Sequence, residues 1–282
     1  MQSVLIIHGG AGSRFNNPTK TRRTQKKITA ILDRTYEKLL SGKDALDAVT
    51  FAVKLLEDDP RFNAGTGSLL QSDGKARLTA SVMDGDRERF AAVINLQNIK
   101  NPVLVARTLL EEEDRVLSDG GAYRYAKKSG FKPQDTRTAN SIRRWKRTKE
   151  TGFDTVGACA LDEYGHLACA TSTGGRGLEL PGRVSDSGMP AGNYANRRCA
   201  ISATGVGEDI MDESVAVKIA TRVEDGMSLE QAMRKTFRKI KQYGRKIGVI
   251  GIDRLGKTAW MTSTDLLIYG WRKGNRRKVF ES

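Results

Sequence analysis

Three threonine-bearing segments, each beside glycine, fall within residues 154–208 of this 282-residue chain. They are Asp154-Thr155-Val156-Gly157, Thr171-Ser172-Thr173-Gly174-Gly175 and Thr204-Gly205-Val206-Gly207. Between the last two lies an isolated pair, Arg183 and Asp186, in a loop rich in glycine and proline. Because loops on a rigid scaffold carry much of a protein's function, this density of small and polar residues predicts a site around which the chain must fold.

Thr155 begins an apolar run, 156–161, that predicts a buried strand, and the run 166–171 predicts its hairpin partner. A threonine here can simply be a β-branched strand former. It can also be a nucleophile, but a hydroxyl then needs a base beside it. One known arrangement uses the residue's own α-amine, which requires a chain N-terminus. Because Thr155 is internal, that interpretation demands cleavage of the Asp154–Thr155 bond.

The ordered segments resemble the N-terminal-nucleophile hydrolases of the plant-type asparaginase and isoaspartyl peptidase group. The resemblance covers nearly the whole chain and is weakest at 13–35, 110–153 and 255–282. It implies an α+β fold, an αββα four-layer sandwich of two stacked sheets covered by helices. It also implies self-cleavage of a single domain, 1–282, into an alpha subunit of 1–154 and a beta subunit of 155–282, which assemble as a dimer of heterodimers, a heterotetramer.

The resemblance assigns the catalytic roles. Thr155 matches the family's nucleophile, freed by cleavage of the bond after Asp154, and Thr173 matches the threonine that orients it. Thr204 and Gly205 match the part of the site that supplies the oxyanion hole. From the residues alone, the run that begins at Thr204 could be a plain turn, but a glycine-rich turn also exposes the backbone N–H groups that an oxyanion hole requires.

The same resemblance assigns substrate binding. Arg183 matches the residue that grips the substrate α-carboxylate, Asp186 holds the α-ammonium, and Gly207 lines the same pocket. A guanidinium offers a planar fork suited to a carboxylate. The alternative for Arg183 and Asp186 is a surface ion pair, the usual fate of such residues close in sequence.

Ser185 and Gly188 depart from the family pattern, which often has glycine and proline at these positions. The loop Gly188-Met189-Pro190-Ala191-Gly192 is consequently unusual. Arg183 and Asp186 are retained, so recognition of the head group is expected, whereas the shape of the loop leaves the preference among substrates open.

The loop 56–67 carries three consecutive acids, Glu57, Asp58 and Asp59. By itself, this run favours a cation site and a charged helix end equally. The loop resembles the family's sodium-binding loop, in which backbone carbonyls bind a structural ion, and oxygen ligands suit a hard cation. The matching carbonyls are those of Leu56, Glu57, Asp59, Phe62, Ala64 and Thr66. The ion would hold the loop that presents Asn63 to the site, and no cofactor is expected for the chemistry.

Composition bounds the remaining possibilities. Three cysteines, Cys159, Cys169 and Cys199, make no disulfide framework and favour a reducing cytoplasm, and the first two lie in apolar strand patterns typical of small buried residues. No apolar run approaches the length of a membrane-spanning helix, and the N-terminus lacks the charged region of a signal peptide. The net charge of +15 permits nucleic-acid binding, but the basic residues are scattered and no nucleic-acid motif accompanies them. Neither a membrane nor a nucleic acid is therefore an expected partner.

The rest of the chain alternates strands and amphipathic helices. Apolar spacing predicts helices at 24–41, 44–56, 101–110, 120–128, 212–225 and 228–243, and strands at 3–8, 77–83, 90–96, 248–253, 257–262 and 266–271. A tight loop is expected from His8 to Gly12, and a frayed basic end at 272–278. Residues 132–154 lose apolar periodicity and are basic, which predicts a mobile linker whose freed ends could separate after cleavage.

The favoured function is that of a self-processing amidohydrolase. It would cleave the side-chain amide of L-asparagine and of β-aspartyl (isoaspartyl) peptides through a covalent threonine ester, releasing aspartate. Two enzymes that share the motifs are alternatives, a glycosylasparaginase and a threonine endopeptidase. The missing signal peptide and few cysteines argue against the first, and the pair Arg183 and Asp186 argues against the second. A different class is a basic nucleic-acid-binding protein on an inactive hydrolase fold, recognisable by salt-sensitive retention on a polyanion without asparagine turnover.

Overall fold

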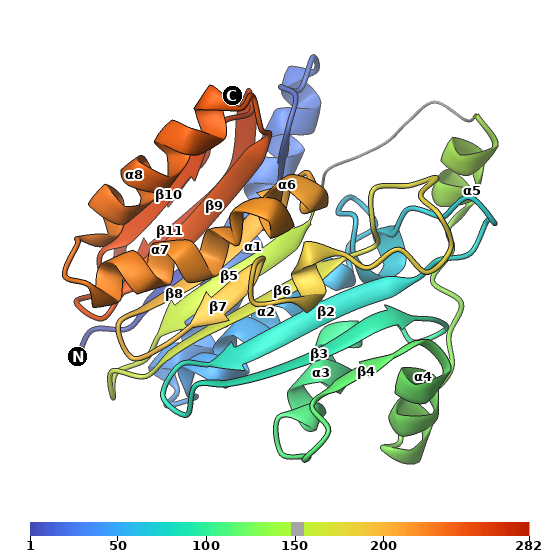
Figure 1. The fold of residues 1–282 in the computed structure, drawn as a ribbon, viewed down its shortest axis with the longest axis horizontal. Helices are drawn as coiled ribbons and strands as arrows, with labels where there is room; N and C mark the ends of the chain where they lie inside the picture. The colour runs from blue at the N-terminus through green and yellow to red at the C-terminus, as the bar shows by residue number, and fades with distance from the viewer. Residues whose placement is uncertain (148–154, 282) are drawn as a thin grey trace.

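Two β-sheets stacked face to face form the centre of the molecule in a computed structural model, which describes residues 1–147 and 155–281 (Figure 1). The larger described sheet contains, in spatial order, β12 (Arg276–Val279), β11 (Leu266–Lys273), β1 (Val4–Gly12), β5 (Val156–Leu161), β6 (Leu167–Thr173), β2 (Leu78–Asp84), β3 (Arg89–Leu96) and β4 (Val116–Ser118). The smaller sheet contains β10 (Thr258–Thr262), β9 (Ile247–Asp253), β8 (Cys199–Gly205) and β7 (Asn193–Ala195). Neighbouring strands are antiparallel except the parallel pair β3 and β4.

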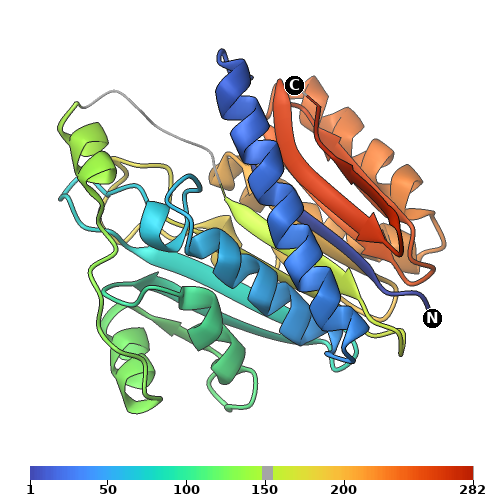
Figure 2. The ribbon, with the colours of Figure 1, turned by 180° about the vertical axis from the view of Figure 1, so that it is seen from behind.

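Helices cover both outer faces of the stack. Those on the larger sheet are α1 (Pro18–Leu40), α2 (Ala45–Glu57) and α3 (Pro102–Leu109), as Figure 2 shows from behind. Those on the smaller sheet are α7 (Val215–Glu224) and α8 (Leu229–Gln242). Strands β1, β5 and β6 contact β8 or β9 across the stack, so the layers run helix, sheet, sheet, helix. The expected mixed fold of stacked sheets covered by helices is confirmed.

Shorter elements complete the described chain. They are α4 (Asp119–Lys128), α5 (Ala139–Lys146), α6 (Gly207–Glu213) and the 3-10 turns Gly65–Gly67 and Asp186–Gly188. A large apolar core lies mainly between α1 to α3 and the larger sheet, and a second lies beneath α7 and α8. None of the helices in the described ranges is long and apolar enough to cross a membrane.

Capping explains where two of the helices begin. Asn17 accepts hydrogen bonds from the amides of Thr19 and Lys20, and Pro18 occupies the first helical position, so α1 begins before the predicted residue 24. Ser228 and Gln231 form a capping box at the start of α8, close to the predicted boundary. Local chemistry therefore overrides apolar spacing at the start of α1, where the first turns carry few apolar residues.

The tight loop predicted from His8 to Gly12 is wrong, because β1 continues through it. Gly10, Ala11 and Gly12 pair with β11, and a bulge between His8 and Gly10 keeps the strand in the sheet. A Cβ at Gly9 would lie 2.6 Å from the Phe62 ring, so glycine permits this close approach. The glycines that suggested a turn instead serve a bulge beside the loop 56–67.

The frayed end predicted at 272–278 is also wrong, since β11 and β12 form a hairpin there. Arg272 pairs in register with Arg277. Their like charges are offset by Asp33 on α1, which contacts Arg272 and Arg277 at 2.7 Å each. The compensating carboxylate comes from a distant part of the chain, so no local pattern predicts it.

The linker predicted at 132–154 requires correction, because α5 lies within it. Thr138 and Ser141 form a capping box that starts this helix. The indole nitrogen of Trp145 donates to the carbonyl of Ser72 at 3.4 Å, and its ring packs beside Gly74. The predicted cleavage residue Asp154 lies outside the described residues.

The cysteines are buried and free, as expected for small core residues. Cys159 and Cys169 are directly opposite each other on β5 and β6, and Cys199 lies on β8. Burial raises the pKa of each of the three thiols. They are therefore inert apolar side chains in the described structure.

Candidate active site

The three predicted threonines meet where the two sheets are stacked. Thr155 directly precedes β5, and Thr173 ends the neighbouring strand β6. Thr204 lies near the end of β8 in the other sheet. The Thr155 hydroxyl donates to the Thr173 hydroxyl at 3.3 Å, and the Thr155 nitrogen donates to the Thr204 hydroxyl at 3.4 Å. All three residues are buried, so the hydroxyl of Thr155 is held on one side and its nitrogen on the other.

A buried polar cluster lies between the sheets behind Thr155. His8 Nε2 is 2.8 Å from the Ser202 hydroxyl, which is 2.7 Å from the Thr171 hydroxyl. Burial lowers the pKa of the His8 imidazole to about 3, against a smaller and opposite influence of the Thr155 backbone. His8 is therefore neutral at pH 7. A Cβ at Gly157 would clash with His8 and Ser202, so glycine is required at this position, two residues after Thr155.

Hydrogen bonds extend from this cluster to the loop that carries Asp186. The Thr171 hydroxyl donates to Asn193 Oδ1 at 3.0 Å, and Asn193 Nδ2 donates to the Ser81 hydroxyl at 3.0 Å. Ser81 in turn donates to the carbonyl of Ser187 at 2.6 Å. The chain of bonds connects β6, the strand that ends at Thr173, to the residue beside Asp186. Sequence analysis missed it, because a single polar residue within an apolar strand gives no sign of its partner on another strand.

A small pocket is lined by Thr155, Arg183, Asp186, Gly207 and Glu208, together with neighbouring residues. We call it the head-group pocket, after the role that the resemblance implies. A Cβ at Gly207 would lie 2.5 Å from Arg183 Nη2 and 2.7 Å from Asp186 Oδ1. Glycine therefore keeps open the space between the guanidinium and the carboxylate.

Asp186 borders this space with its Oδ1 atom, and its Oδ2 atom lies beside Gly192. Asp186 is 2% exposed, and its Oδ1 accepts from the Ser185 hydroxyl at 3.1 Å. Its Oδ2 is buried without a hydrogen-bond partner among residues 1–147 and 155–281. Burial raises the pKa of the Asp186 carboxyl to about 6, against the lowering influence of the Ser185 hydroxyl and Arg183. An ammonium ion in the space beside Oδ1 would favour the charged form of this carboxyl.

Arg183 is paired with Glu208, which sequence analysis did not identify. The Arg183 Nε and Nη2 groups donate to the two carboxylate oxygens of Glu208, each at 2.8 Å. This contact uses two of the five N–H donors of a guanidinium and leaves the others for a second carboxylate. Glu208 directly follows Gly207, and this adjacency was the only sequence signal for its role.

Two further glycines shape the floor of the site. Gly205 has a φ of +133°, and Gly175 has a φ of +82°, both in the region that favours glycine. A side chain at Gly175 would collide with the carboxyl of Glu179, a residue that is 2% exposed. Burial raises the pKa of Glu179, a second acidic residue beside the site that sequence analysis missed.

Asn63 joins the loop 56–67 to the site. Its Oδ1 accepts from the amide of Leu69 at 2.8 Å, and its Nδ2 donates to the carbonyl of Gly175 at 2.5 Å. The amide of Gly175 donates to the Thr173 hydroxyl at 3.2 Å. Hydrogen bonds thus connect Asn63 to Thr155 through two intervening residues, Gly175 and Thr173. Asn63 supports the loop that carries Gly175.

The consecutive acids of this loop are paired within the protein. Glu57 is buried and accepts from the amide of Val103, at the start of α3, at 3.1 Å. The other two acids form ion pairs, Asp58 with Lys54 and Lys100, and Asp59 with Lys27 and Arg61. No cluster of three or more His, Cys, Asp or Glu able to hold a metal occurs in the described parts of the chain. For the side chains of the three acids, the structure thus agrees with the interpretation as a charged helix end.

The backbone oxygens of the loop remain compatible with a hard cation. A Cβ at Gly65 would lie 2.5 Å from the carbonyl oxygen of Glu57, and a Cβ at Gly67 would lie closer still to that of Phe62. Glycine thus lets the 3-10 turn approach these carbonyls. Because carbonyl oxygens are ligands of hard cations, the donor set fits the ion that the resemblance implies.

The stacked sheets, with a buried threonine at the start of a central strand, define a hydrolase of the N-terminal-nucleophile class. The asparaginase family model matches residues 1–281. An isoaspartyl peptidase/L-asparaginase of Nostoc is 42% identical over 98% of this chain and 93% of its own. The isoaspartyl peptidase of Escherichia coli is 35% identical over 96% and 92%, and the plant-type L-asparaginase of Pyrococcus furiosus is 34% identical over 96% of each chain. The chain belongs to the asparaginase family.

Proposed function

We propose that this protein is a self-processing amidohydrolase for L-asparagine and β-aspartyl peptides. The observation that carries the proposal is that Arg183 Nη2 and Asp186 Oδ1 both border the space left by Gly207, in the same pocket as Thr155. That pair matches the α-ammonium and α-carboxylate of an aspartyl head group. The names of the relatives, isoaspartyl peptidase and L-asparaginase, support the same substrates.

Activation begins with cleavage of the Asp154–Thr155 bond. The Thr155 hydroxyl attacks the carbonyl carbon of Asp154, and the peptide nitrogen leaves as the α-amine of Thr155. Water then hydrolyses the resulting ester. The Thr155 nitrogen already lies 3.4 Å from the Thr204 hydroxyl, so the freed amine would stay beside its own hydroxyl.

The catalytic cycle then uses the same atoms. The α-amine takes the proton of the Thr155 hydroxyl, which attacks the side-chain carbonyl of the substrate. Thr204 and Gly205 stabilise the oxyanion, and the α-ammonium returns the proton to the leaving amine. Water hydrolyses the threonine ester and releases aspartate. Thr173, which accepts the hydrogen bond of the Thr155 hydroxyl, sets the direction of attack.

The proposal includes a structural role for a sodium ion and an assembly. The carbonyls of Leu56, Glu57, Asp59, Phe62, Ala64 and Thr66 would hold the ion. Its contribution would be to fix the loop that carries Asn63, with no part in the reaction. We further propose a cytoplasmic dimer of heterodimers, each consisting of residues 1–154 and 155–282.

Blocked substrates test the head-group assignment. Initial rates of the processed protein should be compared on asparagine, β-aspartyl-leucine, N-acetyl-asparagine and aspartylglucosamine. Acetylation removes the ammonium and leaves Asp186 buried without a partner, which costs about 1–3 kcal/mol or more. N-acetyl-asparagine should therefore react at least about fivefold more slowly. Equal rates on free and acetylated asparagine would overturn the proposed function, and fast cleavage of aspartylglucosamine would identify a glycosylasparaginase.

A further inference from the structure

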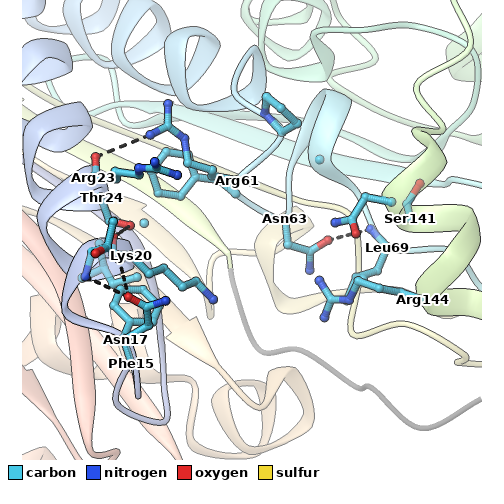
Figure 3. A pocket seen from close by; sticks show the side chains of 17 residues that line it. Phe15, Asn17, Lys20, Arg23, Thr24, Arg61, Asn63, Leu69, Ser141 and Arg144 are labelled. Carbon is cyan, nitrogen blue, oxygen red and sulfur yellow. Dashed lines mark hydrogen bonds between the residues drawn. The ribbon is translucent and has the colours of Figure 1, made fainter. Parts of the chain in front are cut away.

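A cavity of about 400 Å³ adjoins the head-group pocket on the far side of Asn63. Figure 3 shows its lining, drawn from the start of α1, the loop around Asn63 and the start of α5. Asn63 lines the cavity and donates to the carbonyl of Gly175, and Gly175 lines the head-group pocket. The volume lies within the range of small-molecule pockets, about 300–1,000 Å³. The mechanism described above gives this cavity no function.

The cavity, which we call the cationic cavity, is lined by four basic residues and by no aspartate or glutamate among the described residues. The four are Lys20, Arg23, Arg61 and Arg144. Arg61 is partly neutralised, because both oxygens of Asp59 contact its guanidinium at 2.9 Å. Figure 3 shows Lys20 and Arg144 extending toward each other from α1 and α5.

Lys20 and Arg23 are two exposed cations of this lining, and Arg61, which is paired with Asp59, is also exposed. Lys20 and Arg23 are three residues apart on α1 and therefore lie on one face of the helix. The Lys20 ammonium lies 4.7 Å from the centre of the Phe15 ring, which holds it at the cavity wall. Within residues 1–147 and 155–281, no carboxylate forms an ion pair with Arg23.

Two helices add to the positive potential. The first turn of α1 contributes Thr19 and Lys20 to the lining, and the first turn of α5 contributes Asn140 and Ser141. The N-terminus of an α-helix carries a partial positive charge. Side chains and helix dipoles thus have the same sign, and a carboxylate is the complementary ligand.

The position of the cationic cavity relative to the nucleophile indicates which carboxylate it would meet. Arg183 and Asp186 hold the head group at one end of the site, and Thr155 attacks the side-chain carbonyl. The leaving amine must then point away from Arg183, along the wall formed by Thr173 and Gly175, toward Asn63. We propose that the cationic cavity receives the leaving residue of an isoaspartyl peptide and selects one that carries an acidic side chain. This inference rests on the proposed function and names its substrate class.

Three matched dipeptides test the inference. The kcat/KM of processed protein should be measured on β-aspartyl-glutamate, β-aspartyl-glutamine and β-aspartyl-lysine, with asparagine, which releases ammonia, as the reference. We expect the kcat/KM on β-aspartyl-glutamate to exceed that on β-aspartyl-lysine by about tenfold, with the value for β-aspartyl-glutamine between them. High salt should narrow that range, because exposed charges are screened. Equal kcat/KM values on the three dipeptides would overturn the inference while leaving the proposed function in place, whereas a lack of turnover on all four substrates would refute the proposed function itself.

Variants of α1 locate the effect. Lys20→Gln and Arg23→Gln should each lower the ratio of kcat/KM for β-aspartyl-glutamate to that for asparagine by about three- to fivefold. Arg22→Gln is the matched control, because Arg22 is exposed on the same helix but does not line the cavity. Its ratio should equal that of the unaltered protein. An equal drop in all three variants would show a general charge effect and contradict the inference.

Inhibition by inorganic phosphate distinguishes a site for the leaving residue from a site that binds a free anion only. In the proposed site, phosphate should compete with β-aspartyl-glutamate much better than with asparagine, and Lys20→Gln should relieve that competition. If phosphate inhibition depends on Lys20 while the three dipeptides react equally, the cavity binds a free anion only, and the inference is wrong.

Discussion

The head-group pocket and the cationic cavity adjoin at Asn63 and Gly175, and they are built in opposite ways. The head-group pocket is narrow and buried, its charges are matched within it, and Gly207 leaves room for little more than a head group. The cationic cavity is wide, and its exposed cations carry one sign of charge. A buried pocket with charges of both signs accepts only a ligand with matching groups, since an unpaired polar group there costs free energy. An open pocket with charges of one sign changes substrate preference by smaller amounts, since water and salt screen those charges.

The largest effect is expected from Arg183→Ala, which removes the guanidinium that borders the Gly207 space opposite Asp186 and that we propose binds the α-carboxylate. Charge-assisted hydrogen bonds contribute about 1.5–3 kcal/mol each. Loss of two should lower kcat/KM on asparagine by about a hundredfold or more. Cleavage before Thr155 should continue, because it needs no head group. An unchanged KM for asparagine would contradict the assignment.

Gly207→Ala should have the next largest effect. The added methyl group would lie 2.5 Å from Arg183 Nη2 and fill the space for the head group, so kcat/KM on asparagine should fall by at least about tenfold. Gly121→Ala is the matched control, because a Cβ there has no neighbour within 4 Å. The control should keep its activity. If both variants behave alike, Gly207 does not border the substrate.

The titration of Asp186 provides a prediction of intermediate size. Its pKa is raised to about 6 by burial, so below pH 6 the carboxylate is protonated and loses its hold on the ammonium. The kcat/KM on asparagine should fall about tenfold for each pH unit below that value. Ser185→Ala removes a hydrogen bond that favours the charged form, so the inflection should move to higher pH. A profile that does not respond to Ser185→Ala would exclude Asp186 as the titrating group.

A smaller effect is expected from Glu208→Gln. Glu208 competes with the substrate carboxylate for Arg183, and its charge also raises the pKa of Asp186. The side chain of Glu208 is 45% exposed, so its ion pair is screened. The KM for asparagine should fall by about two- to threefold, and the inflection should move to lower pH. A higher KM would show instead that Glu208 positions Arg183.

The smallest effects belong to the cationic cavity, where single charges should change substrate preference by only about three- to fivefold. An effect of Lys20→Gln or Arg23→Gln as large as that of Arg183→Ala would break the comparison between the two pockets. It would mean that the cations of α1 act in the chemistry and not only in the choice of leaving residue.

The sequence predicts the parts of this site that local patterns encode. The apolar run 156–161 placed Thr155 at the start of a strand, and the run 166–171 ended two residues before Thr173, where β6 ends. Periodicity predicted most of the helices and strands that form the layers. Glycine patterns were less reliable, because the same residues serve turns, bulges and close contacts. Gly9 and Gly10 therefore suggested a loop where β1 continues.

The parts that could not be predicted depend on side chains from distant segments. His8 and Ser202 meet only because the two sheets are stacked, and Arg183 meets Glu208 only because α6 begins beside it. Asp33 stabilises the hairpin of β11 and β12 in the same way. Each contact joins residues that are far apart in the sequence, and hydrophobic periodicity does not predict such contacts.

The intact mass of the purified chain, before and after incubation, tests the central claim most directly. The account predicts two fragments, residues 1–154 and 155–282, together with the onset of asparagine hydrolysis. Thr155→Ala should remain a single inactive chain, because its side chain cannot attack the preceding carbonyl. Cleavage of Thr155→Ala at the same bond, or full asparagine turnover by an uncleaved chain, would contradict Thr155 as the nucleophile of both reactions.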